Sequence, residues 1–107
     1  MSSFIGTPSF SESGTIEAEA SSAWYPIWFP FNILVTGEWS GDWVVDVSSD
    51  NGATSAPATA GGTPATFNTN GFYPCPNVYQ KGLLFRITRG VGSGTMNYTI
   101  SGQDVVA

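Results

Sequence analysis

Three polar side chains at alternate positions, Asp46, Ser48 and Asp50 in "DVSSDNG", have the spacing with which oxygen ligands begin a calcium-binding loop. The rest of the loop does not follow the helix–loop–helix pattern. Its glycine falls one residue late, at Gly52, and Pro57 occupies the twelfth position, where a bidentate glutamate is needed. An Asn-Gly pair after an alternating strand instead favours a hairpin turn near residue 51.

The sequence offers few residues for catalysis or for binding other metals. The chain contains no histidine, which removes Ser-His-Asp and Cys-His nucleophiles and the metal sites that need several Cys or His ligands. Glu38 and Asp42 could be a carboxylate pair for glycoside hydrolysis, but nothing in the sequence fixes their separation. Cys75 is the only cysteine and has no evident positive neighbour. We therefore predict no catalytic residue, cofactor or metal, and a protein that is not an enzyme.

Composition narrows the possible partners. The 107 residues suit one domain, and three basic against eight acidic residues give a net charge of −5, which disfavours nucleic acid. Only 10% of residues are charged, as expected of a largely uncharged polar surface. The apolar run 23–37 is too short for a membrane span, and the N-terminus lacks a secretory signal, so we expect no membrane contact and folding in a cytosol.

Prolines shape that apolar run. Pro26 and Pro30 exclude a helix and favour an extended edge strand from Trp24 to Phe31 with its free edge blocked. Trp24 and Trp28 then share one side, where either a loop of the same chain or another subunit could cover them. The other side, predicted to face the core, carries Tyr25, Ile27, Phe29, Phe31, Ile33 and Val35.

Strand patterns recur along the rest of the chain, with residues 1–10 as an N-terminal arm or edge strand. Alternation predicts strands before residue 51 and over 83–101, with a turn supplied by Gly90, Gly92 and Gly94. The fold class is therefore all-β: a single antiparallel β-sandwich or small jelly roll of about six to eight short strands, with a closed barrel as the alternative. One core is predicted from Val45, Val47, Phe85, Ile87, Tyr98 and Ile100.

Three segments, "GDWVVDVSSDNGAT", "TFNTNGFY" and "GLLFRITRGVGSGTMNYTISG", resemble small β-sandwich structural proteins of tailed bacteriophage virions over residues 37–102. The resemblance implies a non-enzymatic, multi-copy virion protein made in the bacterial host cytoplasm. Its partners would be the major capsid protein and copies of itself. Within that class we favour a capsid decoration (cement) protein over a tail or head–tail connector component, and we expect Trp24, Trp28 and Trp39 at the protein interface.

A carbohydrate-binding β-module is the alternative from another class. Exposed aromatic side chains can stack on flat sugar rings, and Trp24, Trp28, Trp39 or Tyr79 could serve in this way. Retention on an insoluble polysaccharide would favour this alternative, whereas recovery only in assembled particles would favour the virion protein.

Overall fold

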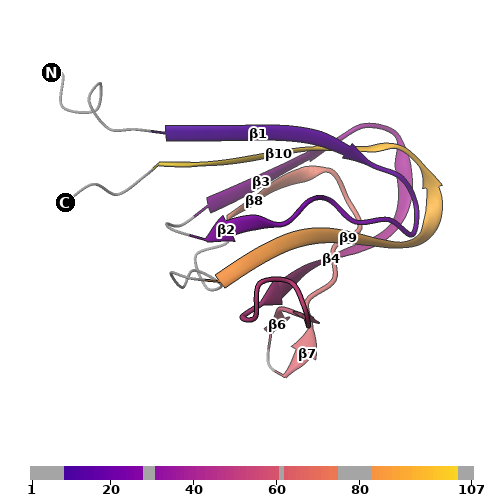
Figure 1. The fold of residues 1–107 in the computed structure, drawn as a ribbon. Coiled ribbons are helices and arrows are strands. Elements are labelled where there is room, and N and C mark those ends of the chain that lie inside the picture. Colours follow the sequence, from indigo (N-terminus) through magenta and orange to yellow (C-terminus); the bar gives the residue numbers. More distant parts are fainter. Residues whose placement is uncertain (1–8, 28–30, 61, 75–82, 104–107) are drawn as a thin grey trace, which may run out of the picture.

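The computed structural model describes residues 9–27, 31–60, 62–74 and 83–103, which form strands and no helix. Figure 1 shows them as two packed layers of antiparallel strands. The strands are β1 (Ser9–Ile16), β2 (Tyr25–Ile27), β3 (Phe31–Thr36), β4 (Trp39–Ser48), β5 (Ala56–Pro57), β6 (Thr59–Ala60), β7 (Thr63–Pro64), β8 (Gly71–Pro74), β9 (Leu83–Gly94) and β10 (Met96–Gln103).

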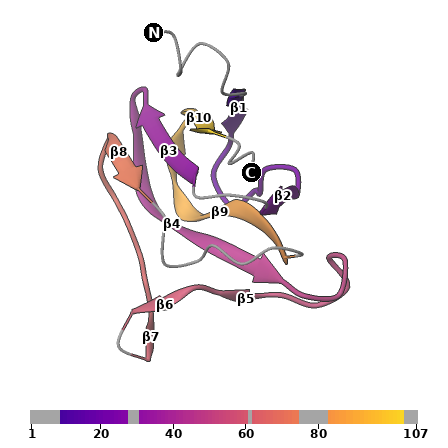
Figure 2. The same cartoon turned by 90° about the vertical axis from the view of Figure 1, so that its left-hand side faces the viewer.

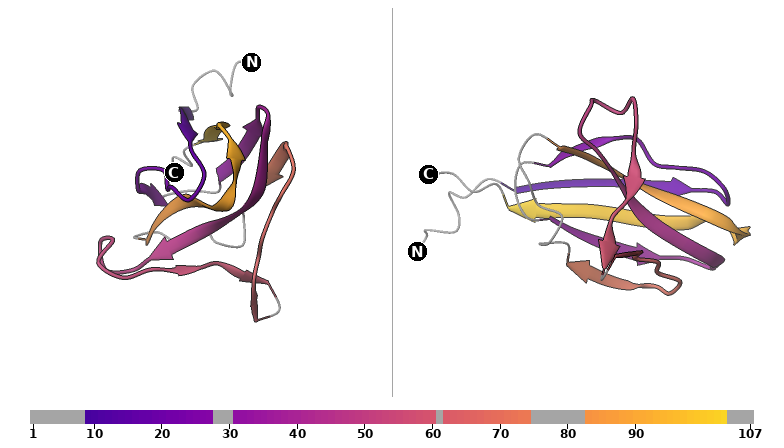
Figure 3. Two further views of the ribbon diagram at one scale, coloured as in Figure 1. Left: turned by 90° about the vertical axis from the view of Figure 1, so that its right-hand side faces the viewer. Right: turned by 90° about the horizontal axis from the view of Figure 1, so that it is seen from below.

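The two large sheets each contain four strands. Sheet A has the order β1-β10-β3-β8 and sheet B the order β2-β9-β4-β5, while β6 and β7 pair separately and project from the sandwich (Figures 2 and 3). Omitting that small hairpin, the first strand pairs with the last, the second with the next to last, and so on inward to β4 and β5. This nested pairing is the topology of a jelly roll. The predicted all-β sandwich of about six to eight strands is confirmed, with eight strands in the two large sheets.

The core lies between the sheets and follows the alternation of the strands. Phe31 of sheet A stacks on Phe85 of sheet B with ring centroids 4.0 Å apart, and both side chains are buried. Of the six residues predicted to share one core, Val47 is partly buried and the other five are buried. In the proline-containing stretch, Tyr25 is partly buried, whereas Phe31, Ile33 and Val35 are buried as predicted. The buried apolar side chains are Ile16, Phe31, Ile33, Val35, Trp43, Val45, Phe85, Ile87, Met96, Tyr98 and Ile100.

Aromatic contacts close the two long sides of the sandwich. On the side of β1 and β2, the hydroxyls of Tyr25 and Tyr98 lie 2.6 Å apart, and burial together with this hydrogen bond raises the pKa of Tyr25. On the other side, Phe67 exchanges backbone hydrogen bonds of 2.8 and 3.0 Å with Trp43. Its ring lies 4.7 Å from Trp43 and 5.0 Å from Tyr73. The linker before β8 therefore completes the core.

The proline-containing stretch forms two strands rather than one. β2 is an edge strand of sheet B that contains Pro26, as the prediction required, but β3 begins at Phe31 as an internal strand of sheet A. The single strand predicted over residues 24–31 is therefore wrong, because the chain changes sheets within it. Residues 28–30 lie outside the described ranges.

The predicted glycine turn is also wrong. β9 continues through Gly90, Gly92 and Gly94, and the change from sheet B to sheet A comes at Thr95. A Cβ atom on Gly92 would lie 2.0 Å from the backbone oxygen of Ser40 on β4. Gly92 and Gly94 thus allow close approach of β9 to β4, next to a β-bulge in their pairing.

The Asn-Gly turn is confirmed, within a wider loop than a tight hairpin. Asn51 and Gly52 have φ angles of 66° and 91°, as both central residues of a mirror-image turn require, and β4 pairs with β5 across residues 49–55. At the N-terminus, residues 9 and 10 belong to edge strand β1. The rest of the predicted arm, residues 1–8, lies outside the described ranges.

Candidate interaction surface

The loop considered for calcium uses its carboxylate internally. Asp50 accepts hydrogen bonds from the Thr54 amide and the Ser48 hydroxyl, both at 2.8 Å, and another from the Thr54 hydroxyl. These bonds stabilise the charged form and lower the pKa of Asp50 to about 2. The Ser48 hydroxyl also accepts the Gly52 amide at 2.8 Å. Ser48 and Asp50 therefore stabilise the turn with their side chains.

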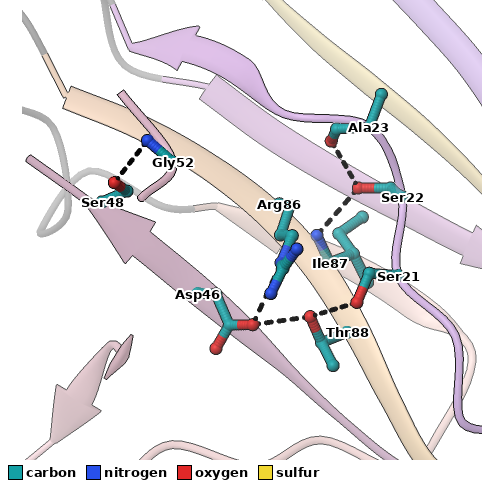
Figure 4. Close-up of polar contacts among 9 residues, drawn as sticks. All are labelled: Ser21, Ser22, Ala23, Asp46, Ser48, Gly52, Arg86, Ile87 and Thr88. Atoms are coloured by element: carbon teal, nitrogen blue, oxygen red, sulfur yellow. Dashed lines mark hydrogen bonds and ion pairs between the residues drawn. The ribbon is translucent and has the colours of Figure 1, made fainter. Parts of the chain in front are cut away.

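Asp46, the first residue of that spacing, lies on the outer surface of sheet B and is nearly buried. Its carboxylate accepts a hydrogen bond from the Thr88 hydroxyl at 2.6 Å and one from Nε of Arg86 at 3.4 Å (Figure 4). The Thr88 and Ser21 hydroxyls are 2.9 Å apart, and the Ser22 hydroxyl accepts the amide of Ile87 at 2.9 Å. This network attaches the connection between β1 and β2 to sheet B.

The remaining acidic candidates lie apart from any such network. Glu38 and Asp42 are exposed near the start of β4. Within the described ranges, no three His, Cys, Asp or Glu side chains are placed to hold a metal ion, and no helix is long and apolar enough to cross a membrane. Cys75 and Tyr79 lie outside the described residues.

Trp24 packs on its own chain. The Arg86 guanidinium carbon lies 4.4 Å from the Trp24 ring centroid, and the Trp24 side chain is half-buried. A Cβ atom on Gly52 would lie 3.1 Å from Trp24 Nε1, so the ring also borders the Asn-Gly turn. Trp24 therefore covers part of sheet B, and only its remaining surface is open to a partner.

Trp39 and Trp28 complete the predicted interface. The Trp39 indole donates a 2.7 Å hydrogen bond to Asn70 Oδ1, and its half-buried ring packs against the core. Trp28 lies outside the described residues. That the three tryptophans form a subunit interface stays a prediction. The two that the structure describes, Trp24 and Trp39, also pack on their own chain.

Arg89 closes the end of the sandwich near the β9–β10 turn. Its side chain is 2% exposed, and its two terminal nitrogens donate four hydrogen bonds of 2.7–2.9 Å to the backbone oxygens of Ile16, Ser40, Ser93 and Gly94. Its Nε has no hydrogen-bond partner. Arg89 thus ties strands of both sheets together and is not available to a ligand.

The outer surface of sheet A has a different composition. Strand register aligns its outward residues in rows across the sheet, for example Ser13, Thr99, Leu34 and Phe72. We call this surface the sheet-A face. It has no charged residue among its described members, which are Ser11, Ser13, Thr15, Asn32, Leu34, Thr36, Phe72, Pro74, Asn97, Thr99 and Ser101.

Leu34 and Phe72 form an apolar pair on the sheet-A face. They are register partners on neighbouring strands and are 42% and 60% exposed. Sequence reasoning missed both. Alternation around the buried Ile33 and Val35 could have placed Leu34 outside, but no local pattern shows that Phe72 lies beside it, because that pairing joins strands 38 residues apart in the chain.

Comparisons of the chain with protein-family models, curated proteins and solved structures find no match. Function is therefore inferred from the residues and their geometry. Among these features the sheet-A face combines an uncharged polar surface with exposed apolar side chains.

Proposed function

We propose that this chain is a non-enzymatic structural protein of a tailed bacteriophage virion, a multi-copy capsid decoration protein that packs against the major capsid protein. The exposed Leu34–Phe72 pair on the uncharged sheet-A face carries the proposal. The jelly-roll topology supports it as well, since many virus capsid proteins have this fold. Lectin domains share the fold, so the surface has to decide between the two.

The sheet-A face suits contact with another protein. Polar surfaces without charge are removed from water at a lower free-energy cost than charged ones, and hydroxyl and amide groups can form new hydrogen bonds with a partner. Fully burying a Leu or Phe side chain contributes about 1.5–3 kcal/mol. Scaled by exposures of 42% and 60%, the pair contributes roughly 1.5–3 kcal/mol in total. One such contact is weak, and many copies on a particle surface would strengthen it collectively.

The location within the virion distinguishes decoration from the alternative in the same class. A tail or head–tail connector component could use the same face, because the surface chemistry does not depend on which virion protein it meets. Electron microscopy of particles bearing a labelled copy of the chain would separate the two, by label over the capsid shell or at the tail and its junction.

Incorporation of variants into particles tests the proposal. The double variant Leu34→Ser, Phe72→Ser should keep its fold and lower the copy number in purified virions, measured by quantitative mass spectrometry at a limiting supply of protein. Val91→Ser is a matched control, because Val91 is a 78% exposed apolar residue of β9, outside this face. Absence of the unmodified chain from virions would refute the proposed function. Full occupancy by the double variant would refute the role of the sheet-A face as the contact surface.

Carbohydrate binding is the second candidate, and one observation favours it. Phe72 is an exposed aromatic ring beside hydroxyl and amide side chains, a combination that can stack on a sugar and hydrogen-bond its hydroxyls. Retention of the purified chain on insoluble polysaccharides, lost in Phe72→Ser and kept in Val91→Ser, would establish this function in place of capsid decoration.

A further inference from the structure

Four strands form the edges of the two large sheets, and three of them carry a proline. β8 at one edge of sheet A has four residues and includes Pro74. β2 and β5, the edges of sheet B, have three and two residues and include Pro26 and Pro57. Proline has no N–H for an added strand, and short edge strands offer few pairing groups. These three edges are protected against strand addition.

The fourth edge, β1, is different. It has eight residues, no proline, and an uninterrupted register with β10 from Ser9 opposite Gln103 to Ile16 opposite Met96. Glu12 is its only charged residue. Among the described strands, β10 is the only one that pairs with β1, so the other edge of β1 presents its backbone groups. A long, regular edge of this kind is a template for another strand.

We propose that β1 pairs antiparallel with the β1 of a second copy, which makes sheet A one continuous eight-stranded sheet. Two identical edges meet antiparallel about a two-fold axis, so the contact closes on itself and involves the same residues on both sides. The proposal deepens the proposed function, on which it rests, by naming the surface through which copies contact one another. In this dimer the copies contact each other through main-chain hydrogen bonds between edge strands rather than through side-chain packing.

The side chains of β1 select one register. Placing Ser13 opposite its own copy also places Glu12 opposite Gly14, which has no side chain of its own and is covered by the phenol of Tyr98. A shift of two residues in one direction puts two Glu12 carboxylates opposite each other, and like charges in that position are unfavourable. The opposite shift puts Glu12 against Ile16. Hence the register centred on Ser13 avoids both conflicts.

Pairing through β1 leaves the rest of the sheet-A face accessible. β1 and β8 are opposite edges of sheet A, and the Leu34–Phe72 pair lies toward β8. A dimer would therefore present two copies of that pair on one extended, uncharged surface. Both contacts can be made at once, which would add the avidity of two linked sites.

Disulfide trapping tests the predicted pairing. In a Cys75→Ser background, Ser13→Cys should form an interchain disulfide, because directly opposite residues of antiparallel strands have Cα atoms about 4.5–5.5 Å apart. Thr99→Cys is the matched control. Thr99 lies next to Ser13 in the same row but one strand further in, so its copies would be about 14 Å apart. Equal cross-linking of the two variants on non-reducing gels would refute the pairing.

Charge complementation tests the same register without cross-linking. Ser13→Lys and Ser13→Glu should each weaken the dimer about fivefold in sedimentation experiments, and mixing them should restore it, because Lys then faces Glu. Asn97→Lys, on the same face but away from the edge, should change the dimer little, and circular dichroism checks that each variant folds. An unmodified chain that stays monomeric at millimolar concentration, or a mixture that does not recover, would overturn the proposal. These measurements use the purified chain, so they stand apart from particle incorporation.

Discussion

Replacing Arg89 with Met should destabilise the fold strongly while leaving its overall shape in place. Methionine keeps the long, flexible aliphatic part of the side chain, so the change mainly removes the guanidinium. Four backbone oxygens then lose a donor at the end of the sandwich, where strands of both sheets meet. The residue is 2% exposed, so water cannot readily replace those bonds.

The magnitude follows from two opposing contributions. Hydrogen bonds from a charged donor stabilise by about 1.5–3 kcal/mol each, so the four hydrogen bonds of Arg89 contribute roughly 6–12 kcal/mol. Burying a guanidinium opposes this by several kcal/mol, a cost that methionine removes. The expected net loss is therefore about 3–5 kcal/mol of unfolding free energy. For a domain of this size it corresponds to a fall in Tm of roughly 12–20 °C.

Urea and thermal unfolding followed by circular dichroism would measure the loss. Arg86→Met is the matched control, because the Arg86 side chain is 31% exposed and its contacts with Asp46 and Trp24 are partly solvated. That variant should lose only about 1 kcal/mol. If Arg89→Met loses less than its control, the four hydrogen bonds do not stabilise the fold in the way described here.

Three further changes test other parts of the structure. Phe85→Ala removes a fully buried ring and should lower the unfolding free energy by about 3–5 kcal/mol in urea titrations, whereas an unchanged Tm would contradict the core assignment. Gly92→Ala places a Cβ atom 2.0 Å from a backbone oxygen and should destabilise by about 1–3 kcal/mol or more, while Gly90→Ala, whose nearest contact is 3.7 Å, should be tolerated; equal Tm values would contradict the strand geometry. The hydrogen bonds that lower the pKa of Asp50 stabilise the loop above its ordinary value of 3.8, and this contribution disappears as pH falls through about 2. In NMR titrations, Thr54→Val should move the Asp50 midpoint upward, and an unchanged midpoint would contradict these bonds.

Local patterns in the sequence predicted the strands well. Alternation placed Phe85 and Ile100 in the core, and the Asn-Gly pair identified the turn at residue 51, because these signals depend on neighbours along the chain. The change of sheet between Ile27 and Phe31 was missed. β2 and β3 share one pattern of alternation, so the sequence predicted a single strand. Alternation shows which side chains face the core but not which sheet a strand joins.

The interaction surface was harder to predict. The tryptophans suggested an interface because of their size, but Trp24 is partly covered by Arg86. These two residues are far apart in the sequence, so no local sequence pattern predicts their contact. Similarly, the glycines of β9 suggested a turn, although the small size of Gly92 and Gly94 allows a close approach to β4. In both cases the missing information was the pairing of strands.

The nested pairing of β1 with β10 has a consequence for folding. Ser13 and Thr99 are hydrogen-bonded across 86 positions of sequence, and every other pair of strands in sheet A also joins distant segments. Folding rates fall as contacting residues become more distant along the chain, so we expect folding in milliseconds to seconds. During synthesis, β10 is the last of these strands to leave the ribosome, and it lies between β1 and β3. Sheet A therefore forms only after β10 has been synthesised, and until then β1 has no strand to pair with.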